Sequence, residues 1–503
     1  MWTAPRPVAV TQVIDNTGRV IEYDRRRPEK SVFYRIVAEH IETLFAEAEQ
    51  NGSGYPVHVK REFERFLSCG VLSAGFARIQ CSKPGCTFER LVAFSCKGRC
   101  ICPSCVSRRM ADCSSHLVDE VMPIAPYRQW TLSLPYDVRF RVGYDKNLLS
   151  AVLSIFLRTV FSYQRLRARR LGVKRPLTGS ITLCQRYGSI LQFTPHFHSW
   201  MPDGVWSENE AGELSFHPLP PPDDADVEDL LLRIAQRVDT LLSDADDDAI
   251  AADDDTQALL AAQAAAISPP VRTRGFGIDS PRCAFFEGYS LHADLATAPH
   301  ERSKLERLLR YGLRPPFAQK RLSLTDAGKV RLKLRKPFYT GQTEIVLDPL
   351  DFLRRLVATI PPKRMNMVRF HGIFAPRANA RPLLKPLLPP KPVALKPTPT
   401  TDGPVLATSD TVDDHATLPP RYRRPWHELL KRVFDIDLVC AVCGHKMHRI
   451  SHIEDPATIN RILGHLGLPT QHPQPAPARD PPQLDFFDLD YLDGPDDLEQ
   501  VVN

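Results

Sequence analysis

Several features are missing from this sequence of 503 residues, and each absence argues against a class of protein. No run of about 18 apolar residues occurs, which argues against a transmembrane helix. The first ten residues, MWTAPRPVAV, lack the charged start and apolar stretch of a secretory signal. No internal repeat is visible, which argues against a repeat architecture. We therefore expect a cytoplasmic protein that is built from two to four domains.

The sequence also has little net charge, and the distribution of charge is more informative than the total. The formal net charge is +6, while acidic residues concentrate at 223–255 and 480–499. The remainder of the chain is therefore more basic than the average suggests. A basic body favours a polyanion such as DNA as the partner. Two solvated acidic loops on an ordinary soluble protein would explain the same composition.

Cysteine is not scarce, and its clustering indicates metal. Twelve cysteines are present, and eight of them lie between Cys69 and Cys113. In a reducing compartment such clusters bind metal more often than they form disulfides. The pairs Cys81–Cys86 and Cys102–Cys105 have a spacing similar to that of a zinc ribbon, which predicts one closed, structural zinc site. A different choice of four ligands, or a second metal, stays possible because other candidates lie nearby: Cys69, Cys96, Cys100, Cys113 and His116.

A second, isolated pair occurs near the C-terminus, at Cys440 and Cys443. His445 and His448 could complete a metal site with this pair. A degraded knuckle without metal explains the pair equally well.

The segment QFTPHFHSWM, residues 192–201, alternates polar and apolar side chains as a β-strand does. Gln192, Thr194, His196, His198 and Trp200 then share one face of the strand. Phe193, Phe197 and Met201 share the opposite face and belong to the core. Two imidazoles at positions i and i+2 project side by side, which suits a divalent metal. Taken alone, such a pair more often consists of two ordinary surface histidines.

The expected helix at 299–313 carries a row of cations beside a tyrosine. Leu305, Leu308, Leu309 and Gly312 fall on one helical face, and Tyr311 falls on the other. A tyrosine hydroxyl is a weak nucleophile until it is activated, and neighbouring cations attract a phosphodiester. We assign contacts with DNA to Arg186 and to the helix residues Lys304, Arg307, Arg310 and Arg314. An amphipathic tyrosine at the protein surface is the simpler alternative.

Several long motifs occur in one order, and together they resemble a known family. They are SCKGRCICPSC, RRMADCSSHLVDEVMPIAPYRQWTLSLP, QRYGSILQFTPHFHSWMPDGVW, LERLLRYGLRPP and VRFHGIFAPRANAR. The chain is similar to the rolling-circle transposases of the insertion sequence ninety-one type, which belong to the HUH (His-hydrophobic-His) nucleases. The resemblance covers about residues 60–380 and, more weakly, residues 426–469.

The resemblance implies an α+β fold, in which a cysteine-rich zinc-binding module precedes a ferredoxin-like antiparallel-sheet nuclease domain. It implies that His196 and His198 hold Mg²⁺ or Mn²⁺, and that Tyr311 cleaves single-stranded DNA through a 5′-phosphotyrosine intermediate. Gln185 on the neighbouring strand is the first candidate for a third metal ligand, because an amide oxygen suits a hard cation. His292 is the alternative ligand. Some members of this class have two tyrosines four residues apart, whereas position 307 is an arginine here. The resemblance therefore implies a single-tyrosine transposase.

On this basis we expect six regions along the chain, with a proline-rich and disordered C-terminal part. They are an N-terminal helical segment (1–60), the zinc-binding domain (61–122), the nuclease domain (123–375) with an acidic surface insertion (207–269), a proline-rich linker (376–425), a small CxxC unit (426–469) and a disordered acidic tail (470–503).

Two other functions fit part of the pattern. A plasmid relaxase or replication initiator would use the same His pair and tyrosine, although the cysteine-rich module argues against it. A non-catalytic zinc-containing DNA-binding protein would use only the metal module and the basic surfaces. A metal-dependent covalent adduct with single-stranded DNA discriminates this last alternative from the nucleases.

Overall fold

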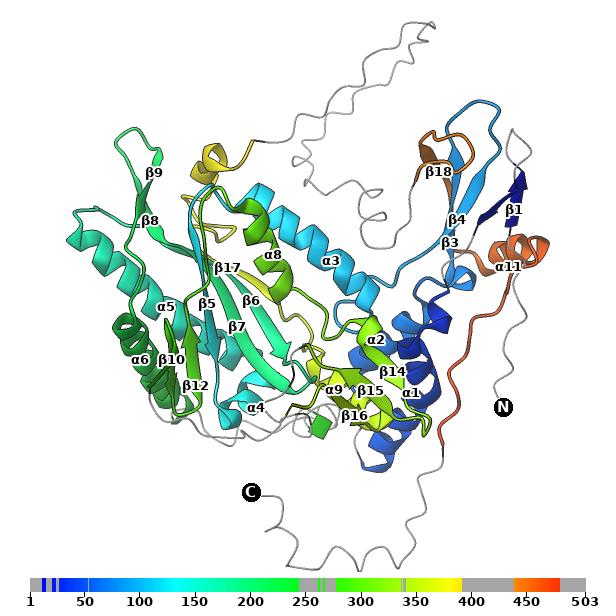
Figure 1. The fold of residues 1–503 in the computed structure, drawn as a ribbon, viewed down its shortest axis with the longest axis horizontal. Coiled ribbons are helices and arrows are strands. Elements are labelled where there is room, and N and C mark those ends of the chain that lie inside the picture. The colour runs from blue at the N-terminus through cyan, green and yellow to red at the C-terminus, as the bar shows by residue number, and fades with distance from the viewer. Residues whose placement is uncertain are drawn as a thin grey trace, which may run out of the picture.

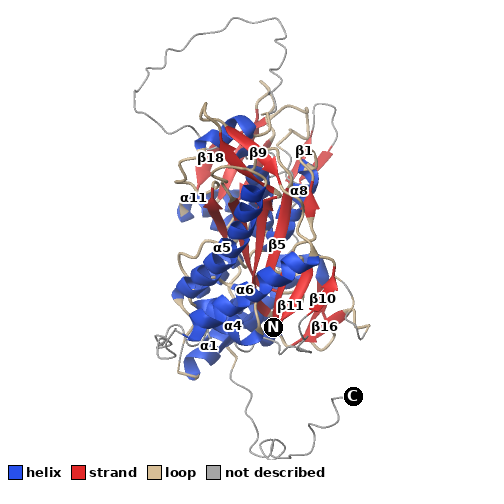
Figure 2. Cartoon of the chain, turned by 90° about the vertical axis from the view of Figure 1, so that its left-hand side faces the viewer, coloured by secondary structure: helices blue, strands red, loops and turns tan. Residues whose placement is uncertain are grey.

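The structure is a computed structural model, and it describes residues 11–14, 20–23, 27–52, 54–243, 261–262, 266, 277–335, 337, 341–390 and 438–479. The described part mixes helices with antiparallel sheets (Figures 1 and 2), as the α+β prediction requires. None of the described helices is both long and apolar enough to cross a membrane.

The central feature is an eight-stranded antiparallel sheet with the order β10-β11-β12-β5-β7-β6-β17, in which β13 also pairs with β5. The strand β7 (Phe193–Pro202) carries both histidines and lies between β5 (Tyr127–Ser133) and β6 (Gly179–Tyr187). The histidine strand therefore lies inside the sheet and not at its edge. The other strands of the sheet are β10 (Gly277–Ser280), β11 (Cys283–Phe286), β12 (Tyr289–His292), β13 (Ala296–Thr297) and β17 (Val368–Gly372).

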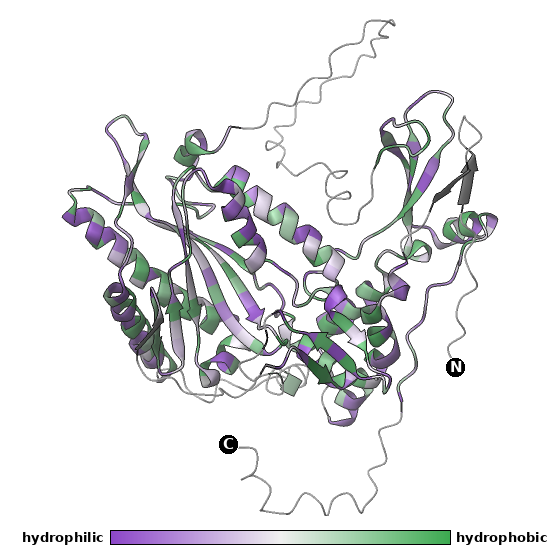
Figure 3. Cartoon of the chain, viewed as in Figure 1, coloured by the Kyte–Doolittle hydropathy of each residue, from purple (hydrophilic) through white to green (hydrophobic). Residues whose placement is uncertain are grey.

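Helices cover the two faces of this sheet differently. Phe197 and Met201 are buried against one group of helices: α4 (Tyr136–Tyr144), α5 (Lys146–Arg170) and α6 (Asp224–Ser243). On the opposite face Trp200 packs with Leu305 and Leu309 of α8 (Arg302–Gly312). Figure 1 shows α5 and α6 on one side of the sheet and α8 on the other, and Figure 3 shows α8 as predominantly hydrophilic. The alternating pattern of β7 thus directs its histidines toward the side that α8 covers.

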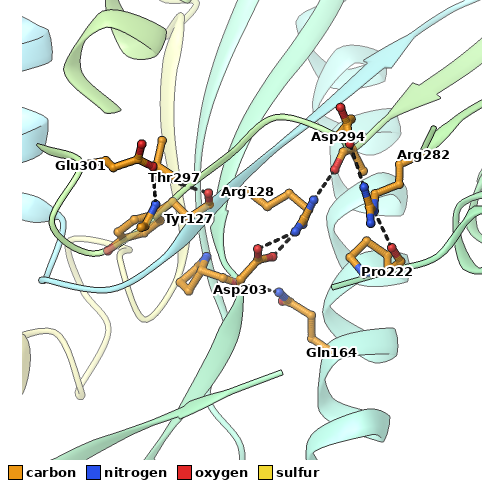
Figure 4. A network of polar contacts seen from close by, with 12 residues as sticks. Tyr127, Arg128, Gln164, Asp203, Pro222, Arg282, Asp294, Thr297 and Glu301 are labelled. Atoms are coloured by element: carbon orange, nitrogen blue, oxygen red, sulfur yellow. Dashed lines mark hydrogen bonds and ion pairs between the residues drawn. The ribbon is translucent and has the colours of Figure 1, made fainter. Parts of the chain in front are cut away.

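A buried ion pair fixes the end of β7 to its neighbours (Figure 4). Arg128 on β5 donates from Nε and Nη2 to the two carboxylate oxygens of Asp203, at 2.8 and 2.7 Å. Its Nη1 also donates to the backbone oxygen of Ala293 at 2.7 Å. Because a bidentate arginine–carboxylate pair is geometrically specific, it holds the strands in register beside the histidines.

The cysteine-rich region joins the sheet through α3 (Pro103–His116), which contacts α8. Its small sheet has the order β18-β3-β4, formed by β3 (Phe76–Cys81), β4 (Glu89–Ala93) and β18 (Met447–Ile453). A separate core unites α1 (Val32–Gln50), α2 (Val57–Ser68), α9 (Pro349–Thr359) and the sheet of β14 (Leu322–Leu324), β15 (Val330–Lys333) and β16 (Glu344–Leu347). The expected boundary at residue 60 therefore falls inside one packed core.

The remaining elements are short or peripheral. They are β1 (Thr11–Ile14), β2 (Val20–Tyr23), β8 (Gly204–Glu208), β9 (Leu214–Pro218), α11 (Pro456–His465), the 3₁₀ helices Pro28–Lys30, Leu72–Ala74, Gln319–Arg321 and Pro382–Leu387, and the π-helix Leu117–Val121.

Three expectations about the polar segments need correction. The segment 207–269, expected to be an acidic surface insertion, contains α6, whose Val227, Leu231 and Ile234 are buried in the core under the sheet, so this helix is not a surface loop. The first part of the expected linker, 376–390, packs on the same core as α8 through Leu384. Its part from 391 onward lies outside the described residues.

The start of the expected tail also has a defined position. The backbone N–H of Ala476 donates to the oxygen of Ala38, and that of Arg479 donates to Oγ1 of Thr43, both on α1. The prediction of disorder from residue 470 is therefore wrong for 470–479. Residues 480–503 lie outside the described residues.

Candidate active site and metal centres

Three potential metal ligands converge where β6 pairs with β7. The register places Gln185 opposite His196, so both side chains lie on the same face of the sheet. Nε2 of His196 lies 3.0 Å from Oε1 of Gln185 and 3.1 Å from Nε2 of His198. Nε2 of His198 lies 3.4 Å from the same glutamine oxygen. The structure thus brings together both predicted histidines and the first candidate for the third ligand.

The protonation of His196 shows why a cation fits between these atoms. Nδ1 of His196 lies 2.7 Å from the backbone oxygen of Thr194, which can only accept, so Nδ1 carries the proton. Burial lowers the pKa of His196 to about 4, so the imidazole is neutral near pH 7. Its Nε2 is then a lone pair that faces the lone pairs of Oε1 of Gln185. Two facing acceptors are satisfied by a cation, and Mg²⁺ or Mn²⁺ accepts a mixed N and O donor set.

His198 is held in place by two residues that the sequence analysis did not single out. Its Nδ1 lies 2.7 Å from the side-chain amide of Gln129 and 3.1 Å from Oγ1 of Thr131, both on β5. Metal binding through Nε2 requires Nδ1–H to donate, and Oγ1 of Thr131 can accept that proton, whereas the amide nitrogen of Gln129 can only donate. The sequence pattern that could have identified them is the segment RQWTLSLP, because its strand alternation puts Gln129 and Thr131 on one face.

The alternative ligand, His292, lies in the same row of the sheet but farther away. Thr131 pairs with His198 on one side and with His292 on the other, so two strand spacings separate the histidines. Two spacings correspond to about 10 Å between backbones. Among the two candidates, the geometry favours Gln185.

Tyr311 lies beside the histidines on the last turn of α8. Its ring centroid is 6.4 Å from that of His198, and the side chain is 48% exposed. Leu305, Leu309 and Gly312 are buried on the opposite side of the helix. The predicted division of this helix into an apolar and a tyrosine-bearing face is therefore present in the structure. This half-exposed side chain beside His198 is accessible to a DNA backbone.

Two guanidinium groups flank the tyrosine ring. Arg314 lies over it at 4.0 Å from the ring centroid, and Arg335 lies at 5.9 Å. Arg335 comes from the segment after β15, and nothing in the local sequence pointed to it. Together the two cations make an electropositive surface where a phosphodiester would approach Tyr311.

The other residues that were predicted to contact DNA differ in their exposure and in their ion pairs. Lys304 pairs with Glu301 at 3.1 Å, and Arg310 pairs with Glu306 at 2.6 Å while also donating to Ser114 of α3. Arg307 is exposed. Arg186 is only 2% exposed and donates to the backbone oxygen of Gly143, so it does not meet DNA on the outer surface.

The clustered cysteines form two groups instead of the single predicted site. The first, which we call the core cluster, consists of Cys69, Cys96, Cys102 and Cys105. Its Sγ–Sγ distances include 3.4 Å between Cys96 and Cys105 and 3.7 Å between Cys69 and Cys105. Four thiolates around one Zn²⁺ at about 2.3 Å lie roughly 3.8 Å apart. These distances fit a tetrahedral zinc site and exceed the disulfide length of about 2.05 Å.

The second group, which we call the clasp cluster, joins Cys81 and Cys86 to Cys440 and Cys443. Sγ of Cys81 lies 3.3 Å from that of Cys443, and Sγ of Cys86 lies 3.8 Å from that of Cys440. Register pairing of β18 with β3, in which Met447 faces Cys81, brings the two segments together. Both clusters have the donor set of structural zinc.

The single site predicted from Cys81, Cys86, Cys102 and Cys105 is therefore wrong as a grouping, because each pair belongs to a different cluster. His445 and His448 do not complete the C-terminal pair and are exposed. Residues 438–468 are consequently not a separate unit: β18 extends the small sheet of the zinc module, and Ile459 and Leu463 of α11 pack on Phe76.

Comparison with known proteins agrees with this arrangement. Residues 179–381 match a family described as putative transposase, and residues 36–134 match the transposase zinc-binding domain of the insertion sequence ninety-one type. The transposase for insertion sequence element IS801 of Pseudomonas savastanoi pv. phaseolicola is 26% identical over 346 residues, which cover 64% of this chain and 71% of that protein. The chain belongs to the insertion sequence ninety-one transposases. No solved structure matches it.

The transposase is accordingly a nuclease and strand-transfer enzyme whose partner is DNA. Its zinc-binding domain and cysteine clusters provide for structural Zn²⁺. The matched spans contain Gln185, His196, His198 and Tyr311, together with the core cluster.

A substitution in the clasp cluster tests whether the two zinc sites bind their ions independently. We expect Cys443→Ser in the transposase to lower bound zinc from about two ions to about one per chain, since three thiolates hold zinc much less tightly than four. The core cluster keeps its ion because it shares no ligand with the clasp. Elemental analysis of purified protein measures the ratio, and limited proteolysis reports release of β18.

Cys102→Ser is the matched comparison. Cys102 is 3% exposed in the core that contains α1, α2 and α9, so its loss should also lower the unfolding temperature of the transposase markedly. Loss of both ions from either variant, or equal destabilisation in the two variants, would contradict two independent sites.

A substitution at Gly312 tests whether the packing of α8 on the sheet positions Tyr311. A Cβ at this position would lie 2.8 Å from Cδ1 of Leu183 and 3.0 Å from Cη2 of Trp200. We expect Gly312→Ala to displace α8 from the sheet, to lower DNA cleavage by the transposase roughly 10-fold to 100-fold and to leave DNA affinity nearly unchanged. Single-turnover cleavage and a binding titration separate the two effects.

Gly464→Ala on α11 is the control for this substitution, because nothing lies within 4 Å of its added Cβ. If Gly312→Ala cleaves DNA as fast as the Gly464→Ala protein, the close approach of α8 to the sheet does not position the tyrosine.

Proposed function

We propose that this transposase cleaves and rejoins single-stranded DNA with Tyr311 as the nucleophile, aided by a divalent cation on His196, His198 and Gln185. One observation carries the proposal: the exposed Tyr311 ring lies 6.4 Å from the His198 ring, between the three ligands and two guanidinium groups. Tyr311 and the three ligand residues come from three separate elements, α8, β7 and β6, and no packing requirement explains why polar side chains converge there.

The chemistry of the step follows from these positions. Oη of Tyr311 attacks the phosphorus of the scissile phosphodiester and forms an Oη–P bond, while the bond from phosphorus to the 3′ oxygen breaks. The phenolic proton passes to water, and the leaving 3′ oxygen takes a proton from water. A divalent cation, when bound, would neutralise charge on the phosphate and stabilise the leaving oxygen.

The cationic groups would hold the strand. Arg314 and Arg335 are close enough to the tyrosine to bind the phosphates on either side of the attacked one. Because the 5′-phosphotyrosine conserves the energy of the phosphodiester, attack by a free 3′-OH reverses the step and joins strands. The cycle therefore needs no nucleotide cofactor.

The test is covalent capture on defined DNA. Full-length protein is mixed with labelled single-stranded oligonucleotides from both ends of its own element, with Mg²⁺, with Mn²⁺ or with EDTA. We expect a detergent-resistant adduct only with a divalent cation, and peptide mapping should locate the label on Tyr311. Cleavage without an adduct, or an adduct on another residue, would overturn the proposal. A protein that binds this DNA without cleaving it under any condition would support a non-catalytic role.

A further inference from the structure

A cavity of about 280 Å³ lies beside the candidate active site, between α3 of the zinc-binding domain and the edge of the main sheet. It exists because the backbone pairing along this edge of β6 ends with the hydrogen bond from Cys184 to Met367, and among the described residues no strand pairs there with Gln185 to Tyr187. The C-terminal end of α8 and the segment after α9 close the remaining walls. The volume is near the lower end of ligand pockets, about 300 Å³, which suits one small ligand.

The cavity is continuous with the groups that the proposed reaction uses. Gln185 lines it, and the oxygen of the same side chain lies 3.0 Å from Nε2 of His196. Gly312 and Arg314, on either side of Tyr311 in the sequence, line it as well. A ligand in the cavity is therefore adjacent to the phosphate that Tyr311 would attack.

The lining has a distinct chemistry. Four arginines contribute to it, Arg99, Arg109, Arg186 and Arg314, and none of the described aspartates or glutamates does. Apolar side chains such as Met110, Leu183 and Met365 make much of the remaining wall, together with the ring of Tyr187. Such walls suit a flat apolar group that is attached to an anion.

Two donors in this lining are unsatisfied. Nε of Arg186 and Nη1 of Arg314 are buried and have no hydrogen-bond partner in the part of the chain that the structure describes. Arg186 is 2% exposed, and its other nitrogens donate to the backbone oxygens of Gly143 and Ala358. Buried donors are almost always paired, so these two nitrogens are available to the acceptor atoms of a ligand in the cavity.

We propose that this cavity receives the base of a nucleotide next to the scissile phosphate, so that α3 of the zinc-binding domain takes part in selecting the DNA sequence that is cut. The base offers a flat face to Tyr187 and the methionines, and acceptor atoms to the unpaired donors of Arg186 and Arg314. The phosphate of the same nucleotide suits the exposed arginines of the lining, Arg99 and Arg109. The inference rests on the proposed function and adds to it the specificity of the cleaved position.

The experiment combines DNA lesions with a cavity-filling substitution. Adduct formation is measured on oligonucleotides in which each nucleotide around the cut is in turn made abasic. We expect one abasic position adjacent to the cut to lower kcat/KM about 10-fold to 100-fold, the usual range for losing a stacked base. A rate unchanged by every abasic position would overturn the proposal without any variant being needed.

The variant Met110→Trp fills the cavity from α3, where Met110 is half-buried. We expect it to lower kcat/KM on intact DNA by a similar factor and to cause no further loss on the abasic oligonucleotide. Ser107→Trp, on the same helix but outside the lining, is the matched control and should cleave like the parent protein. Equal losses from Met110→Trp on intact and abasic DNA would contradict base binding in the cavity.

Two further outcomes separate the possibilities. If the parent protein forms no adduct at all, the proposed function itself fails. If it forms an adduct whose rate is unchanged at every abasic position, only the cavity proposal fails. Each free deoxynucleoside 5′-monophosphate is also tested as a ligand. Tight binding of a free mononucleotide, together with an adduct rate that no abasic position changes, would assign the cavity to a free nucleotide and overturn the proposal.

Discussion

Replacing Tyr311 by phenylalanine should abolish the covalent protein–DNA adduct, with a fall of at least about 1,000-fold in its rate of formation. The substitution removes only the hydroxyl that would form the bond to phosphorus. The ring keeps its place between Arg314 and His198, so the surface that binds the phosphodiester is preserved. Affinity for single-stranded DNA should consequently stay within about twofold of the parent protein, because ring packing is unchanged.

Tyr136→Phe is the matched control for this loss. Tyr136 is also exposed, at 40%, but it begins α4 on the face of the sheet opposite the histidines. Adduct formation in that variant should equal that of the parent protein. A normal adduct yield from Tyr311→Phe would mean that another residue is the nucleophile, and the central proposal would fail.

The second large effect is expected at the histidine pair. His196→Ala or His198→Ala should raise the concentration of Mn²⁺ needed for half-maximal cleavage by at least about 100-fold, since each removes one of three ligand atoms. The Nε2 atoms of the two rings lie 3.1 Å apart, close enough to bind the same cation. Cleavage titrated against Mn²⁺ after chelation measures the shift.

The matched control comes from the same row of the sheet. His292 pairs with Thr131, as His198 does, but lies two strands away from the ligands. His292→Ala should change the Mn²⁺ requirement by no more than about threefold, because it leaves all three ligand atoms in place. A larger effect from His292→Ala than from Gln185→Ala would make His292 the third ligand.

Prediction from sequence succeeded where a local pattern carried the information. The alternation in residues 192–201 predicted which side chains of β7 face the core, and Phe197 and Met201 are buried there. The spacing of Leu305, Leu309 and Gly312 predicted the buried face of α8. The neighbouring strand supplied Gln185 at the predicted position. These features depend on residues within one strand, one helix or one hairpin, where the backbone period alone decides which way a side chain points.

The errors lie where residues far apart in the chain come together. Cys81 and Cys102 have zinc-ribbon spacing, yet Cys81 binds with Cys440 and Cys443, more than 350 residues away in the sequence. Acidic residues made α6 look like a surface segment, although one side of it is buried under the sheet. Arg335 reaches Tyr311 from a different element.

The sequence by itself therefore determined the family, the α+β class, the orientation of each candidate catalytic side chain on its own element and the presence of cysteine sites. The tertiary structure decided which cysteines share an ion, which strand neighbours hold His198 and what lies between α3 and β6. The physical reason is that periodicity is a property of each element alone. A coordination shell or a cavity wall instead depends on the register and packing of several elements, and no local spacing encodes that.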